Sequence, residues 1–127
     1  MTNSFDVRRP RVVPKPWGEE RIFAEGGRYA GKLLRIRRGE ALSLQYHVRK
    51  EETIHVLEGT LGLFVERDGA RADLLLGPGE TFHVTPGTRH RMHAPDGDVL
   101  LVEVSTPELD DVVRLEDRYG REGTSAP

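Results

Sequence analysis

Apolar and polar residues alternate over short stretches of this chain, and glycine separates one stretch from the next. Seven segments carry the pattern: GKLLRIRRG, ALSLQYH, TIHVLEG, LGLFVERDG, ADLLLGPG, TFHVTPG and DVLLVEV. Because successive side chains of a strand point to opposite faces, this pattern predicts β-strands. No strong helical period interrupts them. Strands at about ten-residue spacing predict an all-β antiparallel sandwich or jelly-roll barrel.

The connections between these segments contain turn residues. RDG near residue 69 and GPG at residues 77–79 predict tight turns between consecutive strands, so we expect a meander-like strand order. ELDDVVRLEDRYG near the C-terminus is the one segment that predicts a short helix or turn, because acidic residues near its start suit a helix dipole.

The length of 127 residues fits one domain with one hydrophobic core. Residues 1–16 combine arginines with prolines and predict an extended N-terminal arm. We expect the domain to span residues 17–121 and residues 122–127 to form a frayed tail.

Charge and composition narrow the class of ligand. The net charge of -2 is spread along the chain without a basic stripe, which argues against nucleic acid or a membrane surface as partner and favours a small molecule. The absence of cysteine excludes disulfides and thiolate ligands, so any metal must be bound by nitrogen and oxygen. The N-terminus lacks the apolar run of a signal peptide, and we expect a cytoplasmic protein.

Two motifs in this sequence resemble the signatures of the cupin family. The first is matched by Gly39, Gln45, His47, Glu52 and Gly59, with glutamine in place of the first histidine, and the second by Gly79, Thr85, Gly87 and His90, with threonine in place of proline. The resemblance implies a cupin double-stranded β-helix. The spacing places Gln45 and His47 on one strand face, and after a turn Glu52 is expected on the adjacent strand opposite them.

These motifs predict one divalent metal ion held by Gln45, His47, Glu52 and His90. Two nitrogen and two oxygen ligands suit Zn²⁺ foremost, and also Mn²⁺, Fe²⁺, Co²⁺ or Ni²⁺, with positions left open for water or substrate. His55 and His93 fall outside both motifs, so we interpret them as structural residues.

Longer segments resemble one branch of the cupins, the type II mannose-6-phosphate isomerase domain. They are KPWGEE, GEALSLQYHVRKEETIHVLEGT, TPGTRHRMHAPDGDVLLVEV and DDVVRLEDRYGR. The resemblance implies metal-dependent interconversion of an aldose phosphate and a ketose phosphate. The chain departs from the family's histidine-rich first motif and its following arginine, glutamate, histidine, tryptophan run at Val48, Arg49, Lys50, Thr53 and Ile54.

An isomerase also needs a proton-transfer group and a phosphate site. Lys32 shares a strand face with Leu34 and Ile36, so it is expected to point into the cavity and to contact an anion or move a proton. Arg114 lies in the C-terminal segment that resembles the family, at a matching position, and is therefore the candidate for binding the phosphate. Lys50 or Arg89 could bind it instead.

Two other functions remain open at this stage. The same ligands could serve Fe²⁺ in another cupin enzyme such as a dioxygenase, or the barrel could be a non-catalytic module that binds a sugar or another small molecule. Under each of these functions we expect a homodimer, because pairing protects exposed sheet edges.

Overall fold

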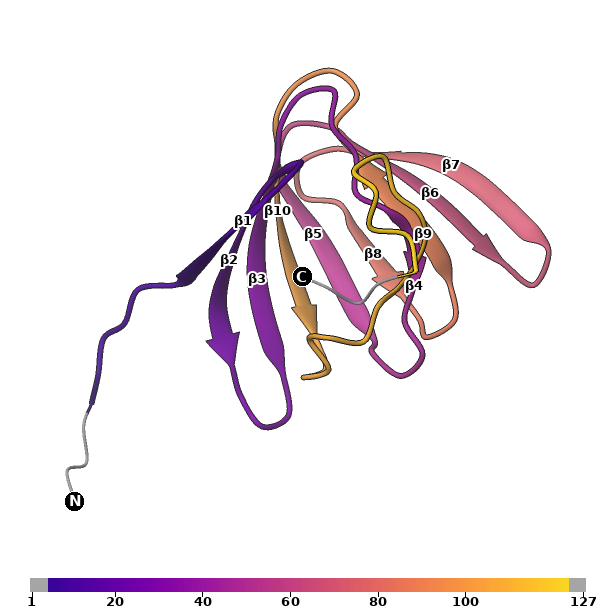
Figure 1. The fold of residues 1–127 in the computed structure, drawn as a ribbon. Helices are drawn as coiled ribbons and strands as arrows, with labels where there is room; N and C mark the ends of the chain where they lie inside the picture. The colour runs from indigo at the N-terminus through magenta and orange to yellow at the C-terminus, as the bar shows by residue number, and fades with distance from the viewer. Residues whose placement is uncertain (1–4, 124–127) are drawn as a thin grey trace.

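The computed structural model describes residues 5–123 and forms two antiparallel sheets that close into a barrel (Figure 1). Within that range there is no helix long and apolar enough to cross a membrane. The strands of the described chain are β1 (Arg11–Lys15), β2 (Gly18–Glu25), β3 (Ala30–Ile36), β4 (Leu44–Tyr46), β5 (Glu52–Glu58), β6 (Leu61–Arg67), β7 (Ala70–Leu76), β8 (Thr81–Val84), β9 (Arg89–His93), β10 (Val99–Ser105) and β11 (Val113–Glu116).

The order of the strands is that of a jelly roll, and the predicted meander is wrong. One sheet has the order β1-β2-β3-β10-β5-β8, and the other has the order β11-β4-β9-β6-β7. Strand β10 lies between β3 and β5, far from both in sequence. These long-range pairs bring distant parts of the chain into one sheet, and the apolar faces of the two sheets pack against each other.

All seven predicted segments form strands, namely β3 to β8 and β10. The RDG turn is also confirmed: Arg67 pairs with Ala70 across Asp68 and Gly69, whose φ angles of 52° and 81° suit a two-residue hairpin loop. Of the short helix or turn predicted near the C-terminus, the helix does not form: turns lie at residues 109–110 and 118–119, and the centre of the segment forms β11, which pairs with β4. Asp111, one of the acids that suggested a helix start, makes other contacts, described below.

The N-terminal hairpin inserts the chain's only tryptophan into the barrel. Strand β1 pairs with β2 so that Lys15 lies opposite Gly18, and Trp17, in the loop between them, is 2% exposed. A β-carbon at Gly18 would lie 1.9 Å from the carbonyl oxygen of Arg35, so only glycine fits there. Part of the predicted arm is therefore a strand, whereas residues 1–4 and 124–127 lie outside the described residues.

The interior of the barrel is apolar at one end and charged at the other. Inward positions of β3 run from Lys32 to Ile36, and β10 places Glu103 opposite Lys32 and Val99 opposite Ile36. Strand β5 adds the buried carboxylate of Glu52 at the charged end. The apolar end is packed from both sheets by the core residues Leu34, Ile36, Val56, Leu61, Leu63, Met92, Ala94, Val99 and Leu101.

We predict that the central strand β10 carries much of the stability. Leu101 is fully buried between β3 and β5, so Leu101→Ala should lower the free energy of unfolding by about 2–5 kcal/mol, measured by urea denaturation. Leu75 is 69% exposed on β7, and Leu75→Ala should change the free energy of unfolding by less than about 0.5 kcal/mol. Equal effects of the two substitutions would contradict this placement of the core.

Candidate metal centre and its cavity

Three buried side chains meet at the charged end of the barrel. His47 Nε2 lies 2.7 Å from Glu52 Oε1, and His90 Nε2 lies 3.4 Å from the same oxygen. One possible ligand atom from each residue lies within 4.8 Å of the others. This is the arrangement of nitrogen and oxygen donors that a divalent metal ion requires.

The two sheets contribute different ligands. His90 lies on β9 and His47 directly follows β4, both of the five-stranded sheet, whereas Glu52 begins β5 of the six-stranded sheet. The expectation that Glu52 lies on a strand adjacent to β4 is therefore corrected: bends after His47 carry the chain across to the facing sheet. The donors consequently approach one another across the barrel.

Backbone carbonyls orient both imidazoles. His47 Nδ1 donates to the carbonyl oxygen of Asp111 at 2.6 Å, and His90 Nδ1 donates to that of Thr88 at 2.9 Å. Because a carbonyl oxygen only accepts, each Nδ1 carries a proton, and each ring turns Nε2, the atom that a metal ion would bind, toward Glu52. Metal-bound histidines are oriented by the same kind of hydrogen bond.

Two buried atoms of the described cluster lack a hydrogen-bond partner, and a bound ligand would fill that place. Among the described residues, neither Glu52 Oε2 nor His90 Nε2 has a hydrogen-bond partner, although both atoms are buried. Burial acts to raise the pKa of Glu52, but the adjacent imidazoles of His47 and His90 and the ammonium group of Lys50 hold it well below its usual value. An ionised carboxylate beside two imidazole nitrogens fits a divalent cation.

Gln45 lies beside this cluster. It faces His90 across the β4–β9 pair and Arg114 across the β4–β11 pair, so the three side chains share one face of the sheet. Gln45 Oε1 accepts a hydrogen bond of 2.7 Å from the hydroxyl of Ser43. Its place as the fourth ligand stays a prediction.

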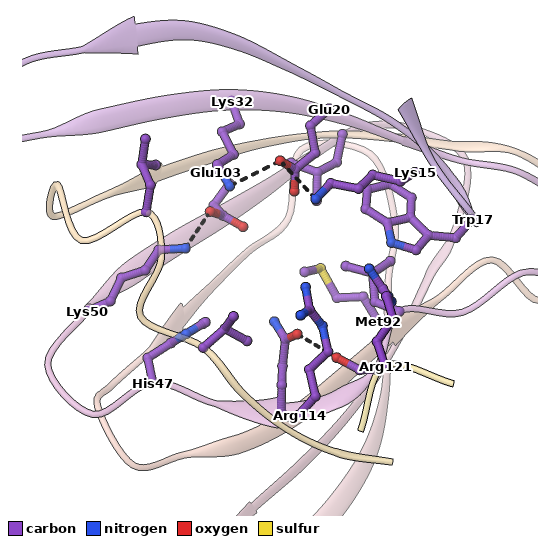
Figure 2. Close-up of a pocket in the computed structure, with 16 residues that line it drawn as sticks. Lys15, Trp17, Glu20, Lys32, His47, Lys50, Met92, Glu103, Arg114 and Arg121 are labelled. Atoms are coloured by element: carbon purple, nitrogen blue, oxygen red, sulfur yellow. Dashed lines mark hydrogen bonds and ion pairs between the residues drawn. The ribbon is translucent and has the colours of Figure 1, made fainter. Parts of the chain in front are cut away.

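A cavity of about 70 Å³ extends from His47 along the charged end. Its wall carries basic side chains from several parts of the chain, and Figure 2 shows them with the acids that they contact. Glu20 Oε1 lies 3.2 Å from Lys32 Nζ and 3.9 Å from Lys15 Nζ. The basic residues in the lining are Lys15, Lys32, Lys50, Arg114 and Arg121.

Glu103 is the acid of the cavity nearest to the candidate metal centre. Lys50 Nζ lies 3.1 Å from Glu103 Oε2 and 4.0 Å from Glu52 Oε2, so one ammonium group contacts both carboxylates. Burial and the negative charge of Glu52 raise the pKa of Glu103 to about 7. A buried carboxyl of this kind can take up and release a proton near neutral pH.

Part of the positive charge in the cavity wall, that of Lys15 and Arg121, lies away from the histidines. Burial first, and then the positive charges of Lys32, Arg114 and Arg121, lower the pKa of Lys15 against the opposing effect of Glu20. Asp117 orients Arg121, because its carboxylate accepts hydrogen bonds of 2.8 and 3.1 Å from that guanidinium. Figure 2 places Trp17 and Arg121 on the opposite side of the cavity from His47 and Lys50. The cavity therefore has a metal-ligand end and a basic end.

The structure brings together most of the predicted site residues. Lys32, Lys50 and Arg114 are buried and line the cavity. Arg89 does not: it precedes His90 on β9, so its side chain points outward, where it is 52% exposed and lies 3.8 Å from Glu66. Arg89 is therefore removed as a candidate for binding phosphate.

The histidines that lie outside the motifs have other surroundings. His55 alternates with the inward positions of β5 and contacts the hydroxyl of Thr81 at 3.0 Å on the outer face. The ring of His93 covers Gly62, where a β-carbon would lie 2.0 Å from it. Neither residue belongs to the three-residue cluster.

Four charged lining residues were not predicted as site residues. Glu103 had a detectable signal, since a charged residue interrupts the apolar alternation of VLLVEV on the buried face. Lys15 and Glu20 flank the tryptophan loop in a segment that looked like an arm followed by surface charge. Arg121 reaches the cavity only because the chain turns back after β11, which no local pattern indicates.

The fold and the paired motifs define the class of protein, a cupin. Solved structures of similar shape include KdgF from Halomonas sp., with a TM-score of 0.68 and 20% identity over 77% of this chain and 88% of that one. Oxalate decarboxylase from Bacillus subtilis superposes with a TM-score of 0.76 and 15% identity over 84% of this chain and 30% of that one. At these identities the likeness concerns the fold.

Within this class, the chain belongs to the family described as mannose-6-phosphate isomerase C-terminal, whose model matches residues 3–117. Relatives include mannose-1-phosphate guanylyltransferase of Escherichia coli K12, 37% identical over 87% of this chain and 23% of the relative. Another is the xanthan biosynthesis protein XanB of Xanthomonas campestris, 34% identical over 87% of this chain and 24% of the relative. The chain thus spans about a quarter of the curated relatives that it matches.

The metal centre gives a direct prediction. Protein purified without an affinity tag and loaded with Zn²⁺ should retain one ion per chain by mass spectrometry, and His47→Ala or His90→Ala should remove it, because each variant loses one donor of the cluster. His55→Ala is the matched control and should keep the ion. Retention of the ion in both of the first two variants would contradict the assignment.

Proposed function

We propose that this protein is a metal-dependent isomerase that interconverts an aldose phosphate and a ketose phosphate of the mannose 6-phosphate type. One observation carries the proposal: His47 of the candidate metal cluster lines a cavity whose wall also carries five basic side chains. A phosphorylated sugar needs a group that polarises its hydroxyl and carbonyl oxygens at one end and cations at the other. The family description supports the same chemistry.

The basic end of the cavity suits the phosphate. Arg114 is 7% exposed and presents a planar guanidinium that can bind two phosphate oxygens together. Arg121 and Lys15 add positive charge nearby. Placing the phosphate here directs the sugar carbons toward His47 and Glu103.

The reaction moves a proton between neighbouring carbons. The C2 proton of the aldose leaves to a base, the C1 oxygen takes up a proton to give an enediol, and a proton then returns to C1 while the C2 hydroxyl loses its own. Glu103 is our candidate for the base, because it is a buried carboxyl in the cavity wall next to the metal ligands. Lys32, opposite it on β3, is positioned to contact the developing negative charge.

A divalent ion bound by His47, Glu52, His90 and Gln45, with Zn²⁺ as the foremost candidate, supplies Lewis-acid polarisation of the sugar oxygens. Within the protein, the ammonium group of Lys50 contacts the carboxyl groups of both Glu103 and Glu52 and so reduces the repulsion between them.

The test of this proposal is conversion of substrate by metal-loaded protein. Mannose 6-phosphate incubated with it and followed by ¹H NMR should yield fructose 6-phosphate, and removal of the metal with a chelator should stop the conversion. Metal-loaded protein that binds mannose 6-phosphate without converting it would contradict the isomerase and favour a non-catalytic binding module.

Two variants separate the proposed roles. Glu103→Gln should lower kcat by about 10²- to 10⁴-fold through loss of the base. Arg114→Ala should raise KM by about tenfold or more with a smaller effect on kcat, because it removes binding of the phosphate. Arg89→Ala, which changes an outward arginine, should leave both constants unchanged. If Arg114→Ala behaves like Arg89→Ala, the phosphate site is misplaced.

We also propose that the protein is a homodimer formed through the outer face of the six-stranded sheet. Phe23, Leu57 and Val104 are 49%, 41% and 49% exposed on that face, which leaves apolar area available for a second copy. Light scattering should give about twice the chain mass of 14.3 kDa. Val104→Asp should halve the measured mass, whereas Leu75→Asp, on the other sheet, should leave it unchanged. A monomeric unmodified protein would contradict the dimer.

A further inference from the structure

The loop of residues 106–112, between β10 and β11, covers the cavity. Leu109 and Val112 of this covering loop contribute to the cavity wall. The cavity volume of about 70 Å³ is far below the roughly 300 Å³ at which ligand pockets usually begin. A sugar phosphate therefore enters only if some part of the wall moves, and the covering loop is a part of it that belongs to no strand.

Asp111 fastens the covering loop to the bends between β4 and β5. Its carboxylate accepts hydrogen bonds from the backbone N–H groups of Val48, Arg49 and Lys50 at 3.0, 2.7 and 2.8 Å. Burial opposes ionisation, but these three donors lower the pKa of Asp111. One side chain thus satisfies three consecutive donors in a segment that has no strand partner for them.

Two further hydrogen bonds hold the start of the covering loop. The N–H of Thr106 donates to the carbonyl oxygen of Glu51 at 3.0 Å, and the N–H of Glu51 donates to the hydroxyl of Thr106 at 3.0 Å. The covering loop is therefore attached at both ends to the segment that connects His47 with Glu52.

The same Asp111 also contacts a metal ligand. Its backbone carbonyl oxygen accepts the proton of His47 Nδ1 at 2.6 Å, and this bond sets the orientation of the imidazole. His47 is 2% exposed. Displacement of Asp111 would remove this acceptor and leave the buried Nδ1–H without a hydrogen bond, so the position of the loop and that of the ligand depend on each other.

We infer that Asp111 is a positioning residue that joins the covering loop to His47, so that lifting the loop to admit substrate also loosens a metal ligand. The inference rests on the proposed metal site but not on the identity of the sugar. The closed loop holds His47 in the orientation that metal binding needs, and weakening its attachment at Asp111 therefore weakens metal binding.

The experiment titrates the metal-free protein with Co²⁺ and follows the visible absorption of the bound ion. Asp111→Ala should weaken Co²⁺ binding by about 10- to 100-fold and speed its release to a chelator by about tenfold or more. Asp111→Asn keeps the size of the side chain but loses the ionised carboxylate; it should fold even where alanine does not, and should shift both quantities in the same direction. Asp110→Ala is the matched control, since Asp110 is the exposed acid next to it.

Affinity and release rate within twofold of the unmodified protein in both Asp111 variants would overturn the inference. So would a loss of thermal stability in these variants with unchanged Co²⁺ affinity, because it would make Asp111 merely structural. An unmodified protein that binds no Co²⁺ overturns the metal site and the inference together. Tight Co²⁺ binding that depends on Asp111 but comes without conversion of mannose 6-phosphate upholds the inference and contradicts only the isomerase.

Discussion

Three buried side chains meet in this barrel, and among the described residues Glu52 Oε2 and His90 Nε2 have no hydrogen-bond partner. Backbone carbonyls accept from Nδ1 of His47 and of His90, so both rings turn Nε2 toward Glu52, which is kept ionised beside them. Buried polar atoms without partners are costly, so such a cluster persists only where a ligand compensates them. A divalent cation accounts for all three donors at once.

The division of the barrel into two ends follows from this constraint. Strands β3, β5 and β10 bury aliphatic residues along one half and then change to Lys32, Glu52 and Glu103 along the other, so the charged groups face one cavity and the core stays apolar. Lys50 contacts both carboxylates, so the loss of hydration of its ammonium group is offset by negative charge. The other basic residues of the lining, Lys15, Lys32, Arg114 and Arg121, add positive charge to the same cavity, which suits an anion.

The strands and the meeting of His47, Glu52 and His90 inside the barrel were predictable from the sequence, whereas their role as metal ligands stays a prediction. Alternation gives the strands, and the face of a side chain follows from its position along them. Strand pairing was not predictable in the same way, since β10 finds β3 across more than half of the chain. The pattern that suggested a helix near residue 111 proved to be the loop that supports His47.

Individual basic residues illustrate the same limit. Arg89 and Arg114 looked alike in sequence, yet one alternates outward beside His90 and the other lies inward opposite Gln45. Lys15 and Arg121 enter the cavity from the two ends of the chain, and only the closed barrel brings them together. Periodicity gives the face of a residue once its strand and register are known, but not which distant strands enclose one cavity.

The most direct test of this account is a crystal structure of protein loaded with Zn²⁺, recorded at the zinc absorption edge. The account predicts one anomalous peak per chain within bonding distance of His47 Nε2, His90 Nε2 and a carboxylate oxygen of Glu52. No peak between these atoms, or a peak only at an outer histidine such as His55, would contradict it.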